Sequence, residues 1–463
     1  MPTETQKTEH ENEETTPFHL SDENIKTILD AVEEQDSDTV HEALEDLSPA
    51  DASDLISKVN DDTRTELLDN YAAAFSPETF LEMDAELQRK TLSSMTAPEV
   101  AAIISELESD DALELIEGLE ESFQTQIIHK LSAKLRVALE EGLSFPEDSA
   151  GRLMQREVVA IPHIWTVGKA IDYLRAASDD LPEDFFDIFV ITPTYHVTGQ
   201  IPLSRLLRTK RGVKLAELTL NEPTQIPADT DQEDVAHLFR REDIVSAPVT
   251  DIEGRLIGVI TIDDIVDVID EEAQEDLMKM AGVDQGDLYR AVWSTTGTRF
   301  RWLFVNLITA ILASIIISFF DATIQQIVAL AVLMPIVASM GGNAGTQALT
   351  VAVRALATHE LSSTNTWRII WKETIVGTLN GAAFAIITGL ITALWFTSPM
   401  LGAVIAAAMI INLFAAGLAG AGIPILLNHI GKDPAVSSTV FLTTITDVVG
   451  FFAFLGLAAL FLL

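Results

Sequence analysis

The chain has 463 residues, no cysteine and a formal net charge of −41, yet 48% of its residues are hydrophobic. Without cysteine it has no disulfides, thiolate metal sites or cysteine nucleophile, and its acidity disfavours binding to nucleic acid or anionic lipid. Residues 301–463 carry five basic and five acidic side chains, so the whole net charge lies in the first 300 residues. We therefore expect an acidic soluble half followed by a membrane half. Solubility or adaptation to a salty cytoplasm would also explain the acidity.

The N-terminal half begins with an acidic tail, residues 1–19, which lacks the apolar stretch of a signal peptide and is predicted to be disordered. Residues 20–145 show helical periodicity with repeated start signals at SPAD (48–51), SPET (76–79) and TAPE (96–99). In each signal a hydroxyl suits the N-cap, proline the first turn, and the acid the positive helix end. This pattern predicts an all-α superhelix of short amphipathic helices.

Residues 146–275 have a different pattern, in which apolar β-type runs alternate with helical ones. The layout occurs twice, and in the second copy a hairpin with its turn at Glu253–Gly254 runs into a helix. The runs lie at 158–161, 186–192, 247–251 and 255–262. This repeat resembles a tandem pair of CBS domains, the small α/β modules that bind adenine nucleotides.

The second CBS copy matches the family's Gly-x-x-Thr-x-x-Asp pattern at Gly258, Thr261 and Asp264. The resemblance implies that Thr261 and Asp264 hold the ribose or phosphate of a nucleotide such as ATP. The first copy has Pro202 and Arg205 at the equivalent positions. A purely structural CBS pair therefore stays an open alternative.

The C-terminal region contains five apolar segments, each long enough to cross about 30 Å of hydrocarbon as a helix. The second segment is too long for one straight crossing, and GGNAG (341–345) predicts a break within it. Lys and Arg flank the start of the first segment and the second and fourth connections, which places the N-terminal half in the cytoplasm and the C-terminus outside. The segments are 302–320, 324–356, 369–396, 401–428 and 435–462.

One acid, Asp447, stands well inside the fifth segment. Burying it unpaired costs roughly 2.5 kcal/mol or more, and no Lys or Arg in the segments is placed to pair with it. It is either protonated or faces water and a cation. Thr443, one turn earlier, and Gly450 share its helical face, which is typical of the wall of a wet pore. A protonated Asp447 bonded to a neighbouring helix is the structural alternative.

Further polar side chains lie in the same half. Asn343, Thr346 and Gln347 belong to the GGNAG region, and Asn380 and Asn412 lie inside the third and fourth segments. Helix packing and pore lining are equally good explanations for any one of them. Together they offer only oxygen ligands, which suit Mg²⁺ or Ca²⁺ more than copper or zinc.

These features together resemble the MgtE family of magnesium channels and transporters. The matching stretches are SFPEDSAGRLM (144–154), PIVASMGGNAGTQ (335–347) and TTITDVVGFF (443–452). The resemblance implies a multidomain membrane protein with an α-helical N domain, α/β tandem CBS domains, a linking helix over residues 276–300 and a five-span domain over 301–463. It also implies a homodimer with the ion path on its axis, where Asp447 selects the ion and Asn343, Thr346 and Gln347 lie near it.

The family further implies gating by cytosolic Mg²⁺. When Mg²⁺ is abundant it screens acids that face one another, and when it falls their repulsion pulls on the linking helix. A solvated surface is the alternative for any single acid, but like charges at i, i+3 and i+4 are unfavourable without a cation. The candidate residues for regulatory Mg²⁺ are Asp110, Asp111, Glu114, Asp263, Asp264, Asp267, Asp270, Glu271, Glu272 and Glu275.

We therefore expect a Mg²⁺-selective, Mg²⁺-gated importer of the plasma (inner) membrane that acts on no nucleic acid. A carrier of Co²⁺, Ni²⁺ or Ca²⁺ and a membrane-anchored Mg²⁺ or nucleotide sensor without transport are the alternatives. We expect no enzyme activity, because the chain has no ATP-hydrolysing G-x-x-x-x-G-K-[ST] loop and its histidines show no HExxH spacing.

Overall fold

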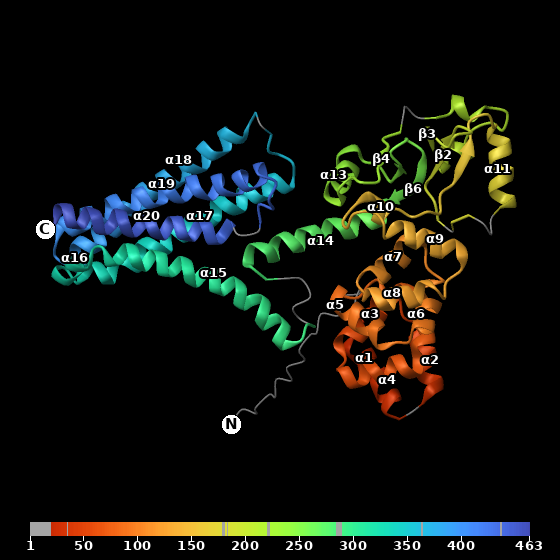
Figure 1. Ribbon diagram of the computed structural model, residues 1–463, viewed down its shortest axis with the longest axis horizontal. Coiled ribbons are helices and arrows are strands. Elements are labelled where there is room, and N and C mark those ends of the chain that lie inside the picture. The colour runs from red at the N-terminus through yellow and green to blue at the C-terminus, as the bar shows by residue number, and fades with distance from the viewer. Residues whose placement is uncertain are drawn as a thin grey trace, which may run out of the picture. The chain divides into compact units, whose positions relative to one another are not determined.

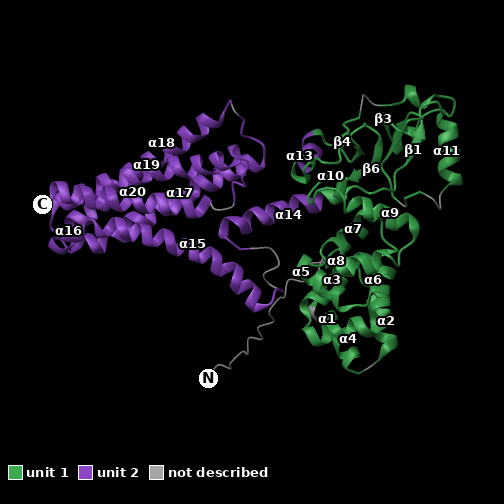
Figure 2. Ribbon diagram, viewed as in Figure 1, with its two compact units in different colours: residues 1–235, 242–265 green, residues 236–241, 266–463 purple. Residues whose placement is uncertain are grey.

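The computed structural model divides into two compact units (Figure 2), and each is described by itself. One unit holds residues 1–235 with Glu242–Ile265, and the other holds Ala236–Arg241 with Val266–Leu463. The acidic tail predicted to be disordered, residues 1–19, lies outside the described residues. The described residues are 20–34, 36–177, 181–182, 184–219, 223–283, 289–362, 364–435 and 438–463.

The first unit begins with short helices, as predicted (Figure 1). Helices of two or three turns are marginal in water by themselves, so burial of their apolar faces against one another holds them. They are α1 (Asp22–Glu33), α2 (Ser37–Glu45), α3 (Pro49–Lys58), α4 (Asp61–Tyr71), η1 (Ala72–Ala74), η2 (Pro77–Phe80), α5 (Ala85–Ser94), α6 (Ala97–Ile104), α7 (Ser109–Glu117), α8 (Glu121–Ile128) and α9 (Ala133–Gly142).

The predicted start signals are helix N-termini in the structure. The Ser48 hydroxyl accepts a hydrogen bond from the Asp51 N–H at 3.2 Å, and Pro49 is the first residue of α3. Thr96 and Glu99 form a capping box, in which the Glu99 carboxylate accepts from the Thr96 N–H at 2.7 Å. Each cap satisfies N–H groups that have no partner inside the helix.

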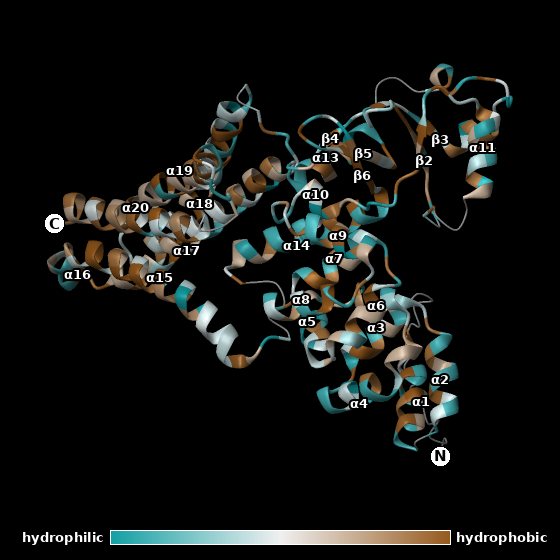
Figure 3. Ribbon diagram, turned by 45° about the vertical axis from the view of Figure 1, so that its right-hand side comes forward, coloured by the Kyte–Doolittle hydropathy of each residue, from teal (hydrophilic) through white to brown (hydrophobic). Residues whose placement is uncertain are grey.

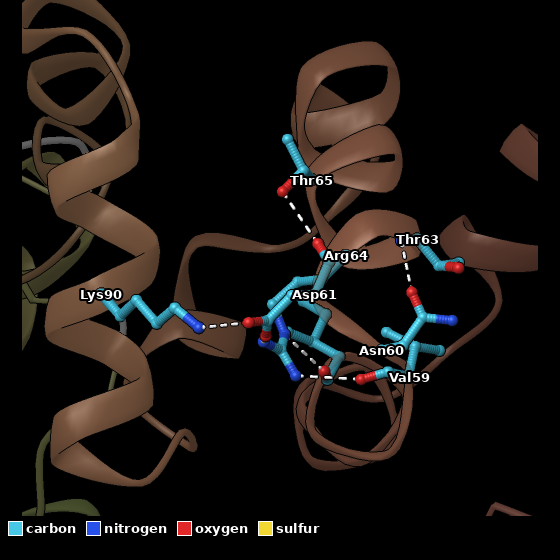
Figure 4. A network of polar contacts seen from close by, with 8 residues as sticks. Val59, Asn60, Asp61, Thr63, Arg64, Thr65 and Lys90 are labelled. Atoms are coloured by element: carbon cyan, nitrogen blue, oxygen red, sulfur yellow. Dashed lines mark hydrogen bonds and ion pairs between the residues drawn. The ribbon is translucent and has the colours of Figure 1, made fainter. Parts of the chain in front are cut away.

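Buried Arg64 ties α4 to the end of α3 (Figure 4). Its guanidinium donates to the carbonyl oxygens of Ile56 at 2.9 Å and Val59 at 3.0 Å, and to the Asp61 carboxylate at 2.6 Å. Asp61 also accepts from Lys90 of α5 at 2.7 Å. One side chain thus satisfies the carbonyls at the end of a helix, where no helical N–H follows.

Two small sheets follow, each with three strands in the same topology. In each, the first strand is parallel to the second, and the second is antiparallel to the third, with a register shift at the equivalent place. This equivalence confirms the predicted repeat. The strands are β1 (Ala160–Pro162), β2 (Asp187–Ile191) and β3 (Val197–Pro202), then β4 (Ile226–Pro227), β5 (Ser246–Thr250) and β6 (Leu256–Thr261).

The predicted hairpin turn at Glu253–Gly254 joins β5 to β6. Gly254 has φ +78°, a conformation that favours glycine. The Asp251 carboxylate accepts from the backbone N–H groups of Glu253 and Arg255, both at 2.9 Å. The helical elements of this region are α10 (Ala150–Leu153), α11 (Val167–Ala176), α12 (Leu203–Leu207), η4 (Leu215–Glu217), α13 (Gln232–Glu242) and α14 (Ile262–Ala281).

The linking helix expected over residues 276–300 coincides with parts of two helices. α14 ends at Ala281, and the next residue, Gly282, has φ +69°, which ends a helix readily. The next helix, α15, begins at Val292. Residues 284–288 of the expected helix lie outside the described residues.

The second unit contains the five predicted apolar helices (Figure 3). In the described part of the chain each is long and apolar enough to cross a membrane. α19 packs against α17, α18 and α20 and is the most buried of the five, whereas α15 packs against α20. The short helix α16 (Asp321–Gln326) follows α15. The five are α15 (Val292–Ser318), α17 (Ala329–Ala357), α18 (Thr366–Trp395), α19 (Pro399–His429) and α20 (Ser438–Phe461).

The predicted break at GGNAG is wrong. α17 is one helix of 29 residues with Pro335 inside it, about 43 Å long at 1.5 Å per residue. Two glycines of this motif, Gly341 and Gly345, serve close packing instead. A Cβ atom on Gly345 would lie 2.7 Å from the Leu442 side chain of α20, so a larger residue would force that side chain to move.

Candidate functional site

Asp447 lies near the middle of α20 and is partly exposed in a single chain. No hydrogen bond or ion pair joins its carboxylate to another of the described side chains. One turn earlier, the Thr443 hydroxyl donates to the Thr439 carbonyl at 3.0 Å, which leaves its oxygen able to accept. A carboxylate at this position in an apolar helix needs water, a cation or another protein surface beside it.

A polar stripe runs along α17. Ser339, Asn343, Thr346 and Thr350 recur at helical spacing, and all four are exposed in a single chain. The Thr346 hydroxyl donates to the Gly342 carbonyl at 3.0 Å, and the Asn343 amide lies 3.4 Å from the Ser339 hydroxyl. Because the threonine hydroxyls donate to their own helix, their oxygens remain free to accept or to hold a cation. Gln347 is exposed beside the stripe.

Asp447 and Asn343 lie at the same level of the second unit. Gly341 of α17 and Gly450 of α20 both face Asn412 of α19, and Gly345 faces Leu442. α17 and α20 therefore run antiparallel. Asn343, midway between Gly341 and Gly345, is level with the part of α20 midway between Leu442 and Gly450. The packing of α17 against α20 thus brings the Asp447 carboxylate and the Asn343 amide to the same level along the helix axes.

Gly450 occupies a different place from the one expected. It is buried, and a Cβ atom added there would lie 2.7 Å from the Asn412 amide nitrogen. Within one chain it is therefore a packing residue on the buried side of α20, whereas Asp447 and Thr443 are partly exposed.

A second acid lies inside a span and was not singled out from the sequence. Glu373, two turns into α18, is only 8% exposed, and its carboxylate lies 3.5 Å from the Lys372 ammonium. Its backbone carbonyl meets α19 closely, because a Cβ atom on Gly417 would lie 2.5 Å from that oxygen. Its burial follows from the contact between α18 and α19, which lies outside the reach of local sequence patterns.

A cluster of carboxylates lies in the first unit, where the start of α7 meets the start of α14. Burial, and then the charges of Asp264 and Asp111, raise the pKa of Asp110 well above its ordinary value. Burial and neighbouring carboxylates, Asp111 and Asp263 among them, raise the pKa of Glu108 to about 7. Burial likewise raises the pKa of Asp264 to about 7, although hydrogen bonds from Thr261 oppose the shift. Glu108 was not predicted.

The structure thus brings together four predicted regulatory residues: Asp110, Asp111, Asp263 and Asp264. Glu114 lies farther along α7, where its carboxylate lies 3.5 Å from the Gln88 amide. No group of three or more His, Asp or Glu side chains is arranged to hold a metal ion among the residues that the structure describes. Carboxylate oxygens are the ligands that suit Mg²⁺.

The other predicted acids lie farther along α14, in the second unit. Lys279 lies between the carboxylates of Glu275, at 2.5 Å, and Asp433, at 2.9 Å. Burial, and then the charge of Asp433, raise the pKa of Asp276, an acid that was not predicted. The end of α14 is thereby held by charge to the segment that precedes α20. Of the remaining candidates, three are exposed and Glu272 is partly buried; the exposed ones are Asp267, Asp270 and Glu271.

The predicted nucleotide residues bond to each other. The Thr261 hydroxyl donates to the Asp264 carboxylate at 2.9 Å, which fixes the turn from β6 into α14. In the first copy, Pro202 ends β3 and Arg205 lies on α12 with its side chain exposed. The two copies therefore share a fold but differ in the chemistry at this position.

Comparison with known proteins finds a matching family for each of the three parts of the chain. Family models match residues 334–457 ("Divalent cation transporter"), 47–148 ("MgtE intracellular N domain") and 215–271 ("CBS domain"). The magnesium transporter MgtE of Thermus thermophilus is 35% identical over 334 residues, which cover 71% of this chain and 73% of that protein. The magnesium transporter MgtE of Enterococcus faecalis is 32% identical over 70% of this chain and 71% of that protein.

The first unit also resembles a solved structure. A crystal structure of the cytosolic domain of the Mg²⁺ channel MgtE in complex with ATP is 28% identical, covers 53% of this chain and 99% of that chain, and superimposes with a TM-score of 0.49. The matched models, the sequence identities and the five apolar helices agree. The chain is a membrane protein of the MgtE family of divalent cation transporters.

Proposed function

We propose that this protein is a Mg²⁺-selective channel or transporter that imports Mg²⁺ across the plasma membrane. The observation that carries the proposal is Asp447, whose carboxylate has no partner among the described side chains and which is level with Asn343 and the polar stripe of α17. Mg²⁺ gives up its waters reluctantly, so carboxylate, amide and hydroxyl oxygens would hold it as a hydrated ion. Gln347 and Thr443 would line the same path. The magnesium transporters among its relatives support this choice of ion.

The path would form between two copies of the chain. In a single chain the stripe residues Asn343 and Thr346 are exposed, and a bilayer cannot satisfy such groups. A homodimer whose α17 and α20 helices face its axis would enclose them around water. The basic residues that flank the spans support an orientation with the N-terminal half in the cytoplasm and the C-terminus outside.

Cytosolic Mg²⁺ would close the path. The proposal is supported by the pKa values of Glu108, Asp110 and Asp264, which burial and then neighbouring carboxylates raise, because such acids are unfavourable when charged. Mg²⁺ held among them, with Asp111 and Asp263, would offset the repulsion and favour the compact arrangement. The acids along α14, Glu275 included, would contribute in the same way.

ATP is proposed as a second regulatory ligand. Thr261 and Asp264 present a hydroxyl and a carboxylate together at the start of α14, as the CBS pattern requires for a ribose or phosphate. Arg205 and Pro202 offer no such pair in the first copy. One nucleotide for each chain is therefore expected, with a purely structural CBS pair as the alternative.

Uptake by proteoliposomes tests the function. Vesicles that contain a Mg²⁺-sensitive dye should fill with Mg²⁺ only when they carry the protein, and uptake should slow when Mg²⁺ bathes the cytosolic domains. Equal uptake of Co²⁺, Ni²⁺ or Ca²⁺ would favour the broader carrier. Absence of any divalent flux from correctly folded protein would favour a membrane-anchored sensor.

A further inference from the structure

Asn412 is a buried amide at the centre of the membrane unit. It is fully buried in α19, the most buried of the five spans. Its Nδ2 donates to the carbonyl oxygen of Val337 in α17 at 2.8 Å. Its Oδ1 has no hydrogen-bond partner among the described residues. A buried polar atom without a partner is unfavourable, so an amide at this position needs an explanation.

Two glycines make room for this amide. A Cβ atom on Gly341 of α17 would lie 2.3 Å from Nδ2 of Asn412, and one on Gly450 of α20 would lie 2.7 Å from the same atom. Both distances are far inside van der Waals contact, so any side chain at either position would displace the amide. Asn412 of α19 therefore contacts two other helices, α17 through a hydrogen bond and a glycine contact and α20 through a second glycine contact.

The two glycines are close in sequence to the residues that are proposed to face the ion. Gly341 lies two residues before Asn343, and Gly450 lies three residues after Asp447. The direction of a helical side chain follows from the position and rotation of its backbone. A contact that fixes the positions of Gly341 and Gly450 therefore also fixes those of the Asn343 amide and the Asp447 carboxylate. Val337, one turn before Gly341, is fixed by the same side chain.

We propose that Asn412 is a positioning residue that sets the height and rotation of Asp447 relative to Asn343 and thereby determines selectivity for Mg²⁺. This inference rests on the proposed function. Asn412 does not touch the ion; it acts through α17 and α20. Its amide provides what an apolar side chain cannot, because the hydrogen bond to Val337 specifies one register of α17 against α19.

A purely structural role makes a different prediction. If Asn412 only filled space, leucine, whose side chain has the same branching and number of heavy atoms, would keep the packing and remove an unsatisfied atom, so selectivity would stay unchanged. Asn428 is the matched control, because it also lies in α19 but is exposed in a single chain.

The first experiment compares Mg²⁺ and Ca²⁺ flux in proteoliposomes for the wild type, Asn412→Leu and Asn428→Leu, with elution volume and melting temperature as folding checks. We expect Asn412→Leu to lower the Mg²⁺-to-Ca²⁺ flux ratio about tenfold while remaining folded, and Asn428→Leu to leave it unchanged. An unchanged ratio in folded Asn412→Leu would overturn the proposal. If wild-type protein carries no divalent ion, the proposed function fails first.

A second experiment, at Gly450, tests the proposal even if the Asn412→Leu protein does not fold. Gly450→Ala should lower Mg²⁺ flux severalfold, because its methyl group collides with the amide. In an Asn412→Ala background the same change should cost little, because the methyl group enters the vacated space. Gly422, also in α19, has no atom within 4 Å of an added Cβ, so Gly422→Ala should be neutral in both backgrounds. Equal damage by Gly450→Ala in both backgrounds would contradict the proposal.

Discussion

Asp110 and its neighbours show how burial and like charge act on one residue. Burial is the largest cause of its raised pKa, and the carboxylates of Asp264 and Asp111 add to it. An acid whose pKa is higher in the folded state binds more protons there than in the unfolded state. Folding stability therefore falls as pH rises from the ordinary value, about 4, through the raised one, and the loss is complete above it.

Replacing Asp110 should therefore stabilise the first unit in a pH-dependent way. Asp110→Asn should raise its free energy of unfolding by ~1–2 kcal/mol at pH 8 and by little at pH 4, because the loss of stability caused by the native carboxylate accumulates as pH rises above the ordinary pKa of an aspartate. Proteolysis of the full-length protein across a urea series, followed at fragments from residues 20–145, measures this.

Asp69→Asn provides the control for that change, because Asp69 is exposed on α4. It should show no such pH-dependent gain. A gain for Asp110→Asn that is equal at both pH values would show that charge repulsion is not its cause.

Residues differ in how far the sequence reveals them. Asp447 is evident because an acid interrupts an apolar run, and Asn343 because it stands among glycines in a span. Glu373 was overlooked because its burial depends on α19, which is distant in sequence. Glu108 and Asp276 were overlooked because their raised pKa values arise from burial and then from acids on other segments.

At the scale of elements, the short helices depend on side chains that satisfy their ends. Arg64 is only 7% exposed and gives hydrogen bonds to two carbonyls at the end of α3 and to Asp61. Removing the guanidinium leaves the buried carbonyl oxygens without partners, which costs more than the bonds themselves contribute.

Arg64→Met should lower the free energy of unfolding of the N-terminal helices by ~2–4 kcal/mol. Arg89→Met is the matched control, because Arg89 is half exposed and pairs only with Glu86 on the surface of α5. It should cost under ~1 kcal/mol. The proteolysis series described above reports both. Similar losses in the two variants would mean that Arg64 has no special role in ending α3.

Turns and helix ends that depend on neighbouring residues can be predicted from the sequence. The turn at Gly254 and the caps at Ser48 and Thr96 each depend on residues within a few positions, and all three lie where predicted. The break at GGNAG was wrong because glycine in a membrane helix also serves close packing, and only the partners Asn412 and Leu442 reveal which use applies.

For the whole molecule, the division of charge is the dominant feature. The acidic half and the nearly neutral membrane half were evident from composition, and the five apolar helices confirm the second. A formal charge of −41 concentrated in one half resists compaction, so divalent cations should favour its compact state. How two copies of that half would be arranged in the proposed dimer depends on surfaces between chains, which composition does not encode.

Mg²⁺ should therefore protect the acidic half from proteolysis. In full-length protein, millimolar Mg²⁺ should slow cleavage within residues 20–283 severalfold. NaCl at equal ionic strength should protect less, because screening alone does not bridge carboxylates. Identical digestion in the two salts would remove the basis for gating by cytosolic Mg²⁺.

Mg²⁺ flux through proteoliposomes that carry Asp447→Asn tests the central claim most directly. Asp321→Asn, at an exposed acid in the first turn of α16, controls for the loss of a charge. If the Asp447 carboxylate selects the ion, Asp447→Asn should lose at least tenfold in Mg²⁺ flux while eluting like the wild type, and Asp321→Asn should conduct normally. Wild-type Mg²⁺ flux through folded Asp447→Asn would contradict the account and would place the ion path elsewhere.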